Sequence, residues 1–255
     1  MNLPDWLYEK PALPAEETFD RFVKSFEGQK ISDLLSGNPS FQNADYLFPN
    51  ENVIAELKTL QTDFGTTDSF RAKHIELAKK YLSESRMTLS AVFHSAEQPK
   101  EYIGDLLRLF RPSLGRILKK ANRQLRDTKR KLNLPNTPGI LLLINDDFLS
   151  LEPRFISSII YEILSHSYTS IDACVYLTLN HYVDIPGNNY ENLLWIPVYY
   201  SERSPDSLRG FVNKLGSQWF QFLETETGEF DNRIVTDDPA SILQAKAIPR
   251  SPHES

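Results

Sequence analysis

Two carboxylates and a lysine converge on one face of a predicted β-hairpin. The arms of the hairpin are residues 45–48 and 53–60, and the residues between them have the composition of a turn. Pairing of the arms around that turn places Asp45 opposite Glu56, and alternation along a strand puts Lys58 on the same face. We call these three residues the charged trio. Like charges placed so close destabilise a sheet, so the two acids need a metal ion or a basic partner.

The ordinary alternative for the charged trio is a solvated strand face that carries acids and a lysine. The apolar residues of the hairpin argue against it, because they occupy both faces of the second arm. A strand that is apolar on both faces is usually covered on both sides. Leu47, Ile54 and Leu60 share the face of the charged trio, and the opposite face carries Tyr46, Phe48, Val53, Ala55 and Leu57.

The spacing of the charged trio resembles the motif of the PD-(D/E)XK, or restriction-endonuclease-like, nuclease superfamily. That motif is an Asp on one strand, a gap, and Glu/Asp-X-Lys on the next strand. It stands here as Asp45, a ten-residue gap, and Glu56-Leu57-Lys58. The resemblance implies that Asp45 and Glu56 bind metal, that the backbone carbonyl of Leu57 adds a ligand, and that Lys58 is catalytic. One departure from the motif is Ala44, where many members have proline.

The resemblance also implies a fold and two further candidate residues. The expected fold is α/β, a restriction-endonuclease-like core with a mixed β-sheet flanked by helices, and with added helices and strands after the motif. A helix before the hairpin often supplies another acidic ligand, and Glu27 is the candidate here, with a solvated helix glutamate as the alternative. Several branches place a polar residue on the helix after the motif. Gln124 is that candidate, and a residue at the boundary of the apolar stripe is the alternative.

The chemistry expected of the charged trio is phosphodiester hydrolysis. Two carboxylates can hold Mg²⁺, with Mn²⁺ as a substitute, and a bound metal ion activates water and stabilises the leaving oxygen. Lys58 then orients or deprotonates the water and offsets phosphate charge. We expect a metal-dependent nuclease, most readily a DNA endonuclease, and RNA is the less favoured substrate. Phage defence and DNA repair are both compatible roles. The alternative is a catalytically silent protein of the same fold that binds nucleic acid or a partner protein.

A predicted helix over residues 114–132 reverses the acidic balance of the chain. The formal net charge of the whole sequence is −6, which does not suggest a general binder of polyanions. This helix nevertheless has a single acid among many bases, so it predicts a local phosphate-binding surface, with a solvated helix face as the alternative. The residues expected to bind nucleic acid are Arg116, Lys119, Lys120 and Arg123, and further bases follow at Arg126, Lys129, Arg130 and Lys131.

Hydrophobic periodicity predicts one domain, residues 16–239, between an irregular arm at 1–15 and a flexible tail at 240–255. A strand–helix–strand order near the middle of the chain predicts parallel pairing. Predicted helices cover residues 16–27, 69–83, 153–165 and 208–223, together with a helical region that is interrupted near Pro112 and ends at Leu132. Predicted strands outside the hairpin cover residues 87–93, 139–144, 171–179 and 194–200.

The composition of the 255 residues is that of an ordinary globular protein, with 40% hydrophobic and 24% charged residues. The only cysteine, Cys174, lies in an apolar run and is expected in the core, which fits a cytoplasmic protein. No signal pattern or membrane-spanning apolar run is recognisable. Asp146 and Asp147 at a predicted strand end are either functional or part of a turn into the next helix. A homodimer or a partner protein is compatible with the sequence.

Overall fold

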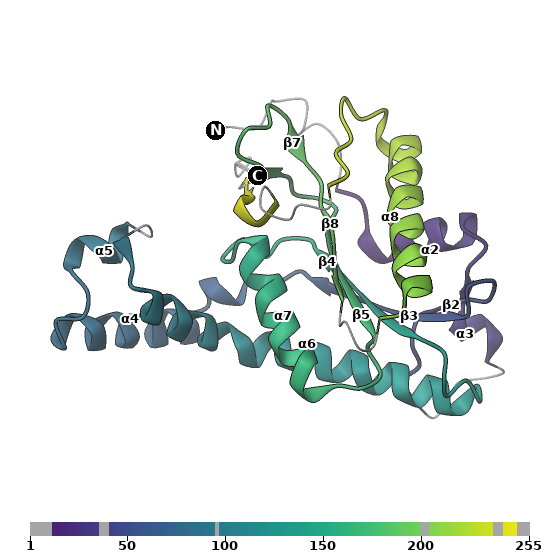
Figure 1. Ribbon diagram of the computed structural model, residues 1–255, viewed down its shortest axis with the longest axis horizontal. Helices are drawn as coiled ribbons and strands as arrows, with labels where there is room; N and C mark the ends of the chain where they lie inside the picture. Colours follow the sequence, from purple (N-terminus) through teal and green to yellow (C-terminus); the bar gives the residue numbers. More distant parts are fainter. Residues whose placement is uncertain (1–11, 36–40, 95–96, 200–203, 237–241, 249–255) are drawn as a thin grey trace.

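The computed structural model describes residues 12–35, 41–94, 97–199, 204–236 and 242–248. Its centre is a mixed six-stranded sheet with the strand order β1-β2-β3-β4-β5-β8 (Figure 1). The expected α/β class with a mixed sheet is therefore confirmed. The strands are β1 (Gln29–Lys30), β2 (Tyr46–Phe48), β3 (Val53–Leu60), β4 (Gly139–Asn145), β5 (Ala173–Thr178) and β8 (Trp195–Tyr199).

The predicted hairpin is formed by β2 and β3, and its register is the predicted one. The antiparallel pairs are Tyr46 with Ala55, Leu47 with Ile54, and Phe48 with Val53. The turn between the strands needs one residue with positive φ, and Asn52 supplies it at 54°. The register therefore follows from the apolar alternation of the two arms together with the turn residues between them.

The centre of the sheet is parallel, as the strand–helix–strand order predicts. All of β3 from Ile54 onward pairs with β4, and β4 pairs in parallel with β5 through the helix α7 (Pro153–Ser167). Pro153 begins that helix, where its missing N–H has no cost. The last strand, β8, is antiparallel to β5. Every residue of β4 and β5 is buried, which explains their unbroken apolar sequences.

Helices cover both faces of the sheet, with α2 (Ala15–Ser25) and α8 (Asp206–Thr227) on one side and α6 (Lys100–Lys131) and α7 on the other (Figure 1). The α2–α8 side holds an aromatic cluster in which Phe19 and Phe22 contact Trp219 at ring centroid distances of 4.9 and 5.1 Å. The core on the α6–α7 side combines aliphatic and aromatic residues, with Leu114 and Leu118 of α6 fully buried and with Phe110 close to Phe148. Both faces of β3 are therefore covered, as predicted, and the charged trio does not lie on a solvated face.

An arm built from α4 (Asp68–Ser83), α5 (Leu89–Phe93) and the beginning of α6 extends away from the sheet (Figure 1). The strand predicted over residues 87–93 is wrong, because Leu89–Phe93 is helical. Thr88 starts this helix by accepting a hydrogen bond from the backbone N–H of Ala91. A small core of its own fixes the arm, and it consists of Tyr81, Met87, Ala91 and Tyr102.

The predicted break at Pro112 is also wrong, because α6 is continuous from Lys100 to Lys131. Proline removes one backbone hydrogen bond within a helix. Burial of apolar side chains on either side of it, at Phe110 and Leu114, stabilises the helix across that gap. The remaining helices are short: α3 (Ile31–Leu34), η1 (Phe64–Thr66) and η3 (Ile242–Gln244).

A second, three-stranded sheet involves part of the predicted flexible tail. Its strand order is β7-β6-β9, with β6 (Val183–Asp184), β7 (Glu191–Asn192) and β9 (Lys246–Ala247). Ala245 and Ile248 are buried beside β9, so residues 242–248 are packed against the domain rather than loosely held. The ends of the predicted arm and tail, residues 1–11 and 249–255, lie outside the described residues. None of the helices described is sufficiently long and apolar to span a membrane.

Candidate active site

Asp45 lies at the point where β2 and β3 separate. Its backbone N–H donates to the carbonyl of Ala55 at 3.2 Å, and its side-chain Oδ2 accepts from the backbone N–H of Leu57 at 2.7 Å. A side chain therefore takes the hydrogen bond that a longer β2 would make with its backbone. Asp45 remains beside Glu56 as predicted, but as the cap of the ladder rather than as a ladder pair.

Glu56 is fully buried between β3 and the α6–α7 layer. Lys58, which is 18% exposed, donates from Nζ to Glu56 Oε1. The other carboxylate oxygen, Oε2, is buried and has no hydrogen-bond partner among the residues that the structure describes. An unpartnered oxygen of a buried carboxylate is costly unless it is protonated or bound by a ligand. The structure therefore brings the charged trio together and leaves one strong acceptor unused.

The pKa values of the two acids also show that the site has too little positive charge. Burial, and then the nearby carboxylate of Asp45, raises the pKa of Glu56 from 4.5 to about 8, although Lys58 opposes both effects. Burial also raises the pKa of Asp45, and the hydrogen bond from Leu57 and the charge of Lys58 only partly offset it. One lysine does not compensate a buried acid and a partly buried one, so the site favours an additional positive charge.

Gln124 projects from α6 toward the hairpin, but its contact is with the chain before Asp45. Its Nε2 donates to the carbonyl of Asn43 at 2.9 Å, and its Oε1 is buried with no hydrogen-bond partner within the described ranges. One turn further along α6, Thr128 Oγ1 accepts from the backbone N–H of Ala44 at 2.7 Å. Gln124 and Thr128 thus both contact the chain before Asp45, and Thr128 was not predicted because a threonine in an amphipathic helix gives no distinctive signal.

Glu27 is not placed beside Asp45. The helix α2 ends at Ser25, and Glu27 follows it with a positive φ of 59°. Its carboxylate accepts from Asn50 Nδ2 at 3.3 Å, at the turn of the hairpin. Asn50 lies in the turn, whereas Asp45 lies beyond the other end of β2. The helix before the hairpin therefore ends too early, and turns too far from Asp45, for Glu27 to share a metal ion with it.

The acids of α2 that do act on Asp45 are Glu16 and Asp20, and both raise the pKa of Asp45. Asp20 is bonded to Tyr46 Oη at 2.8 Å and to Lys30 Nζ at 2.6 Å. Glu16 is exposed at the beginning of the helix. The sequence did contain a signal for Glu16 and Asp20. They are four residues apart and so lie on one face of the helix, next to the buried Phe19.

The charged trio fits a hard divalent cation better than it fits a complete protein cage. In the described part of the chain, no three or more His, Cys, Asp and Glu side chains are grouped so as to hold a metal ion. Mg²⁺, however, often takes only one or two carboxylates and keeps several waters. The unpartnered Glu56 Oε2 and the raised pKa values of both acids are what two ligands without their cation would show. The carbonyl of Leu57 remains an expected ligand.

The basic residues of α6 divide into two groups. Arg116, Lys119, Lys120 and Arg123 are exposed, and Lys120 is close enough to lower the pKa of Glu56. Lys129 does not belong with them, since it is buried and paired with Asp172 at 3.3 Å. These four exposed bases lie on the outer side of α6, opposite its buried apolar residues, and we call this surface the α6 basic face.

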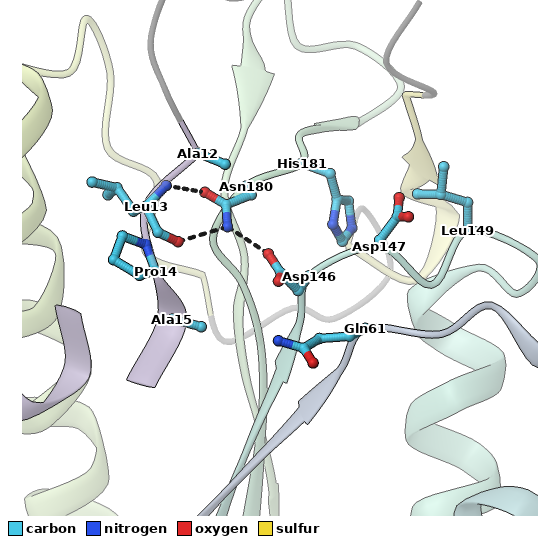
Figure 2. A pocket seen from close by; sticks show the side chains of 10 residues that line it. All are labelled: Ala12, Leu13, Pro14, Ala15, Gln61, Asp146, Asp147, Leu149, Asn180 and His181. Carbon is cyan, nitrogen blue, oxygen red and sulfur yellow. Dashed lines mark hydrogen bonds between the residues drawn. The ribbon is translucent and has the colours of Figure 1, made fainter. Parts of the chain in front are cut away.

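A cavity of about 460 Å³ lies elsewhere, where the parallel strands β3, β4 and β5 end (Figure 2). Figure 2 shows Asp146 accepting a hydrogen bond from Asn180, which also bonds to both backbone groups of Leu13. The charged trio does not line this cavity. Asp146 and Asp147 thus lie in a hollow at the carboxyl ends of the strands, and Pro153 begins the next helix beyond them.

Comparison with known proteins gives no match, whether to a family model, to a curated protein or to a solved structure.

Proposed function

We propose that this chain is a metal-dependent nuclease that hydrolyses phosphodiester bonds, with DNA as its substrate. The observation that carries the proposal is the charged trio itself. Two carboxylates lie together at the end of a strand ladder, the buried one has an unpartnered oxygen, and a lysine contacts it. A protein that only needed a stable sheet would gain nothing from burying Glu56 beside Asp45.

In this proposal each member of the trio has a separate task. Asp45 and Glu56 would hold Mg²⁺, and the ion would supply an activated water and stabilise charge at the phosphorus and the leaving oxygen. Lys58 is held beside Glu56 and keeps its ammonium where it can orient the water and offset phosphate charge. Occupation of the site by a cation would also lower the pKa of Glu56, so that the carboxylate is charged at neutral pH.

The mixed sheet flanked by helices supports a restriction-endonuclease-like core as the finer fold assignment. The motif strands β2 and β3 form a hairpin, a helix precedes them, and α6 packs over the face that carries Glu56. The α6 basic face then provides contacts to phosphates that position the nucleic acid without reading its sequence. Such contacts fit DNA and RNA alike, and the preference for DNA rests on the resemblance of the motif.

Cleavage of four substrates tests the proposal: supercoiled plasmid, linear duplex, single-stranded DNA and single-stranded RNA, each with Mg²⁺, Mn²⁺ or EDTA. We expect metal-dependent cleavage of DNA, and a loss of about a hundredfold or more in Glu56→Ala and in Lys58→Ala. The matched controls are Glu51→Ala and Lys214→Ala, which break an exposed Glu–Lys pair near the hairpin turn. Equal activity in Glu56→Ala and Glu51→Ala would overturn the assignment.

Binding measurements separate the nuclease from a catalytically silent binder of nucleic acid. Replacing Arg116, Lys119 and Arg123 together by Glu should reduce the slope of log K against log salt by about 3 if each contacts one phosphate. The control changes three exposed bases of α4 in the same way, namely Arg71, Lys73 and Lys79. Salt-dependent binding by a wild-type protein that cleaves none of the four substrates would favour the silent binder.

A further inference from the structure

The chain just before Asp45 is held by three side chains of α6. Residues 42–44 belong to no helix or strand. Arg123 donates to Gln42 Oε1 at 3.0 Å, Gln124 donates to the carbonyl of Asn43 at 2.9 Å, and Thr128 accepts from the N–H of Ala44 at 2.7 Å. These contacts follow one another along both the helix and the segment, so the irregular segment is aligned with α6 residue by residue.

The contact made by Thr128 is the most buried of the three. Thr128 and Ala44 are both 0% exposed, whereas Arg123 and Gln42 lie at the surface. A buried backbone N–H requires an acceptor, and the Thr128 hydroxyl oxygen provides one immediately before the candidate metal ligand. The backbone N–H and C=O of Asp45 bond to Ala55 and Ile31, so the hairpin and the beginning of α3 hold its other sides.

We infer that Thr128 is a positioning residue, which fixes the carboxylate of Asp45 relative to Glu56 by holding the N–H of Ala44. This inference rests on the proposed function, because it assigns Thr128 a task in the same site. Thr128 touches neither acid. It acts through the backbone, as an outer support of a metal ligand does, and loss of such a support typically costs roughly 10–100-fold in metal affinity or activity.

The test compares Thr128→Val, which keeps the shape and removes the acceptor, with Thr128→Ser, which keeps the hydroxyl. The matched control is Thr137→Val, because Thr137 is also a buried threonine and its hydroxyl donates to Asn52 Oδ1, at the turn of the same hairpin. Three quantities are measured: the affinity for Mn²⁺ by electron paramagnetic resonance, kcat and KM for DNA cleavage, and hydrogen exchange of the Leu57 amide, which Asp45 holds.

In Thr128→Val we expect Mn²⁺ affinity and kcat to fall roughly tenfold or more, with KM for DNA unchanged because the α6 basic face is intact. The Leu57 amide should exchange faster. Thr128→Ser should restore all three values, and Thr137→Val should leave them as in the wild type even if it lowers the melting temperature. A wild-type Leu57 exchange rate and wild-type Mn²⁺ affinity in folded Thr128→Val would overturn the inference.

Gln124→Met is the second variant, in case Thr128→Val does not fold, because it removes only the donor to Asn43. We expect changes in the same direction and of smaller size, since Asn43 is one residue further from Asp45, and wild-type values throughout would count against the inference. The Leu57 amide also separates the two proposals. If the wild type neither binds Mn²⁺ nor cleaves DNA, the nuclease proposal fails, while the exchange rate still decides whether Thr128 holds Asp45.

Discussion

Two buried pairs of opposite charge lie beside α6, and they differ in how completely the protein satisfies them. Lys129 donates to Asp172 and to the carbonyl of Ser170, and Asp172 also accepts from the backbone N–H of Gly139 at 2.7 Å. We call this the satisfied pair. Glu56 and Lys58 form the other pair, in which one carboxylate oxygen has no partner in the described part of the chain and a second acid lies close by.

In our proposal, this difference separates a structural use of buried charge from a functional one. The satisfied pair joins the end of α6 to the beginnings of β4 and β5, and its contacts are all provided by the chain. The charged trio lies on and beside β2 and β3, which the sheet already pairs, so it adds no new link between elements. Its unpartnered Glu56 oxygen leaves an acceptor for a cation. Burial alone does not identify a site, because Lys129 is as deeply placed as many functional residues. The feature that suggests a site is the Glu56 carboxylate oxygen that has no hydrogen-bond partner among the described residues.

Removing the lysine should cost much more in the satisfied pair than in the trio. In Lys129→Met, the Asp172 carboxylate loses its cationic partner in a largely buried position, so we expect a loss of about 3 kcal/mol in the free energy of unfolding. In Lys58→Met at pH 6, Glu56 can keep its proton because its pKa is about 8, so the loss should be about 1 kcal/mol or less. Urea unfolding measures both, and equal losses would remove the distinction.

Magnesium should stabilise the protein through the trio and not through the satisfied pair. A ligand that binds only the folded state adds about 2.7 kcal/mol at a concentration of one hundred times its Kd. We expect that gain in the wild type and in Lys129→Met, measured from a less stable starting point. Glu56→Gln should gain little. Calorimetric melting with Mg²⁺ and with EDTA provides the measurement, and an equal shift in Glu56→Gln would place the metal elsewhere.

The stability of the metal-free protein should fall as the pH rises through the neutral range. A carboxyl group whose pKa is raised on folding binds more protons in the folded state than in the unfolded state. For Glu56 this applies from pH 4.5 to about 8, so it lowers the free energy of unfolding by up to about 1.4 kcal/mol for each pH unit.

Unfolding in EDTA between pH 5.5 and 7.5 measures this dependence. Glu56→Gln removes the titrating group and should flatten the decline, and Lys129→Met should retain it. A wild-type decline that persists in Glu56→Gln would show that another group causes it.

The smallest expected change in stability comes from replacing Asp by Asn, and its sign should differ between the charged trio and the satisfied pair. In EDTA at pH 8.5, Asp45→Asn removes a repelling charge, and its side-chain oxygen can still accept from Leu57, so stability should rise by roughly 0.2–1 kcal/mol. Asp172→Asn takes the counter-ion from Lys129 and should lower stability. Melting temperatures in EDTA test both signs, with Asp45→Ala as the control that loses the hydrogen bond to Leu57.

The hairpin could be predicted from the sequence because its information is local. Alternating apolar residues fixed which face Glu56 and Lys58 share, and four turn residues fixed the register from Phe48 with Val53 onward. Residues 87–93 were mistaken for a strand because the run is short and apolar. Its helical state depends on the cap at Thr88 and on packing against the arm. Pro112 was mistaken for a break because its cost is local, whereas the burial that offsets it is tertiary.

The surroundings of the site were harder to predict from the sequence, because they depend on which distant segments contact each other. Lys129 looked like another base of an exposed stripe, and only the meeting of α6 with Asp172 makes it structural. Glu27 looked like the last residue of a helix, but the chain turns two residues earlier. Thr128 gave no signal at all, since its importance comes from the N–H of a residue 84 positions earlier.

The hydrogen bond from the Leu57 N–H to Asp45 also affects the edge of β3 that other chains could pair with. Three residues of β2 pair with an eight-residue β3, so the second half of β3 has a free edge on that side in the described part of the chain. A free strand edge is a template on which another chain can add a strand. The carboxylate of Asp45 occupies the N–H of Leu57, where such an added strand would begin. The acid that we propose as a metal ligand therefore also removes one of the N–H groups with which an added strand would pair.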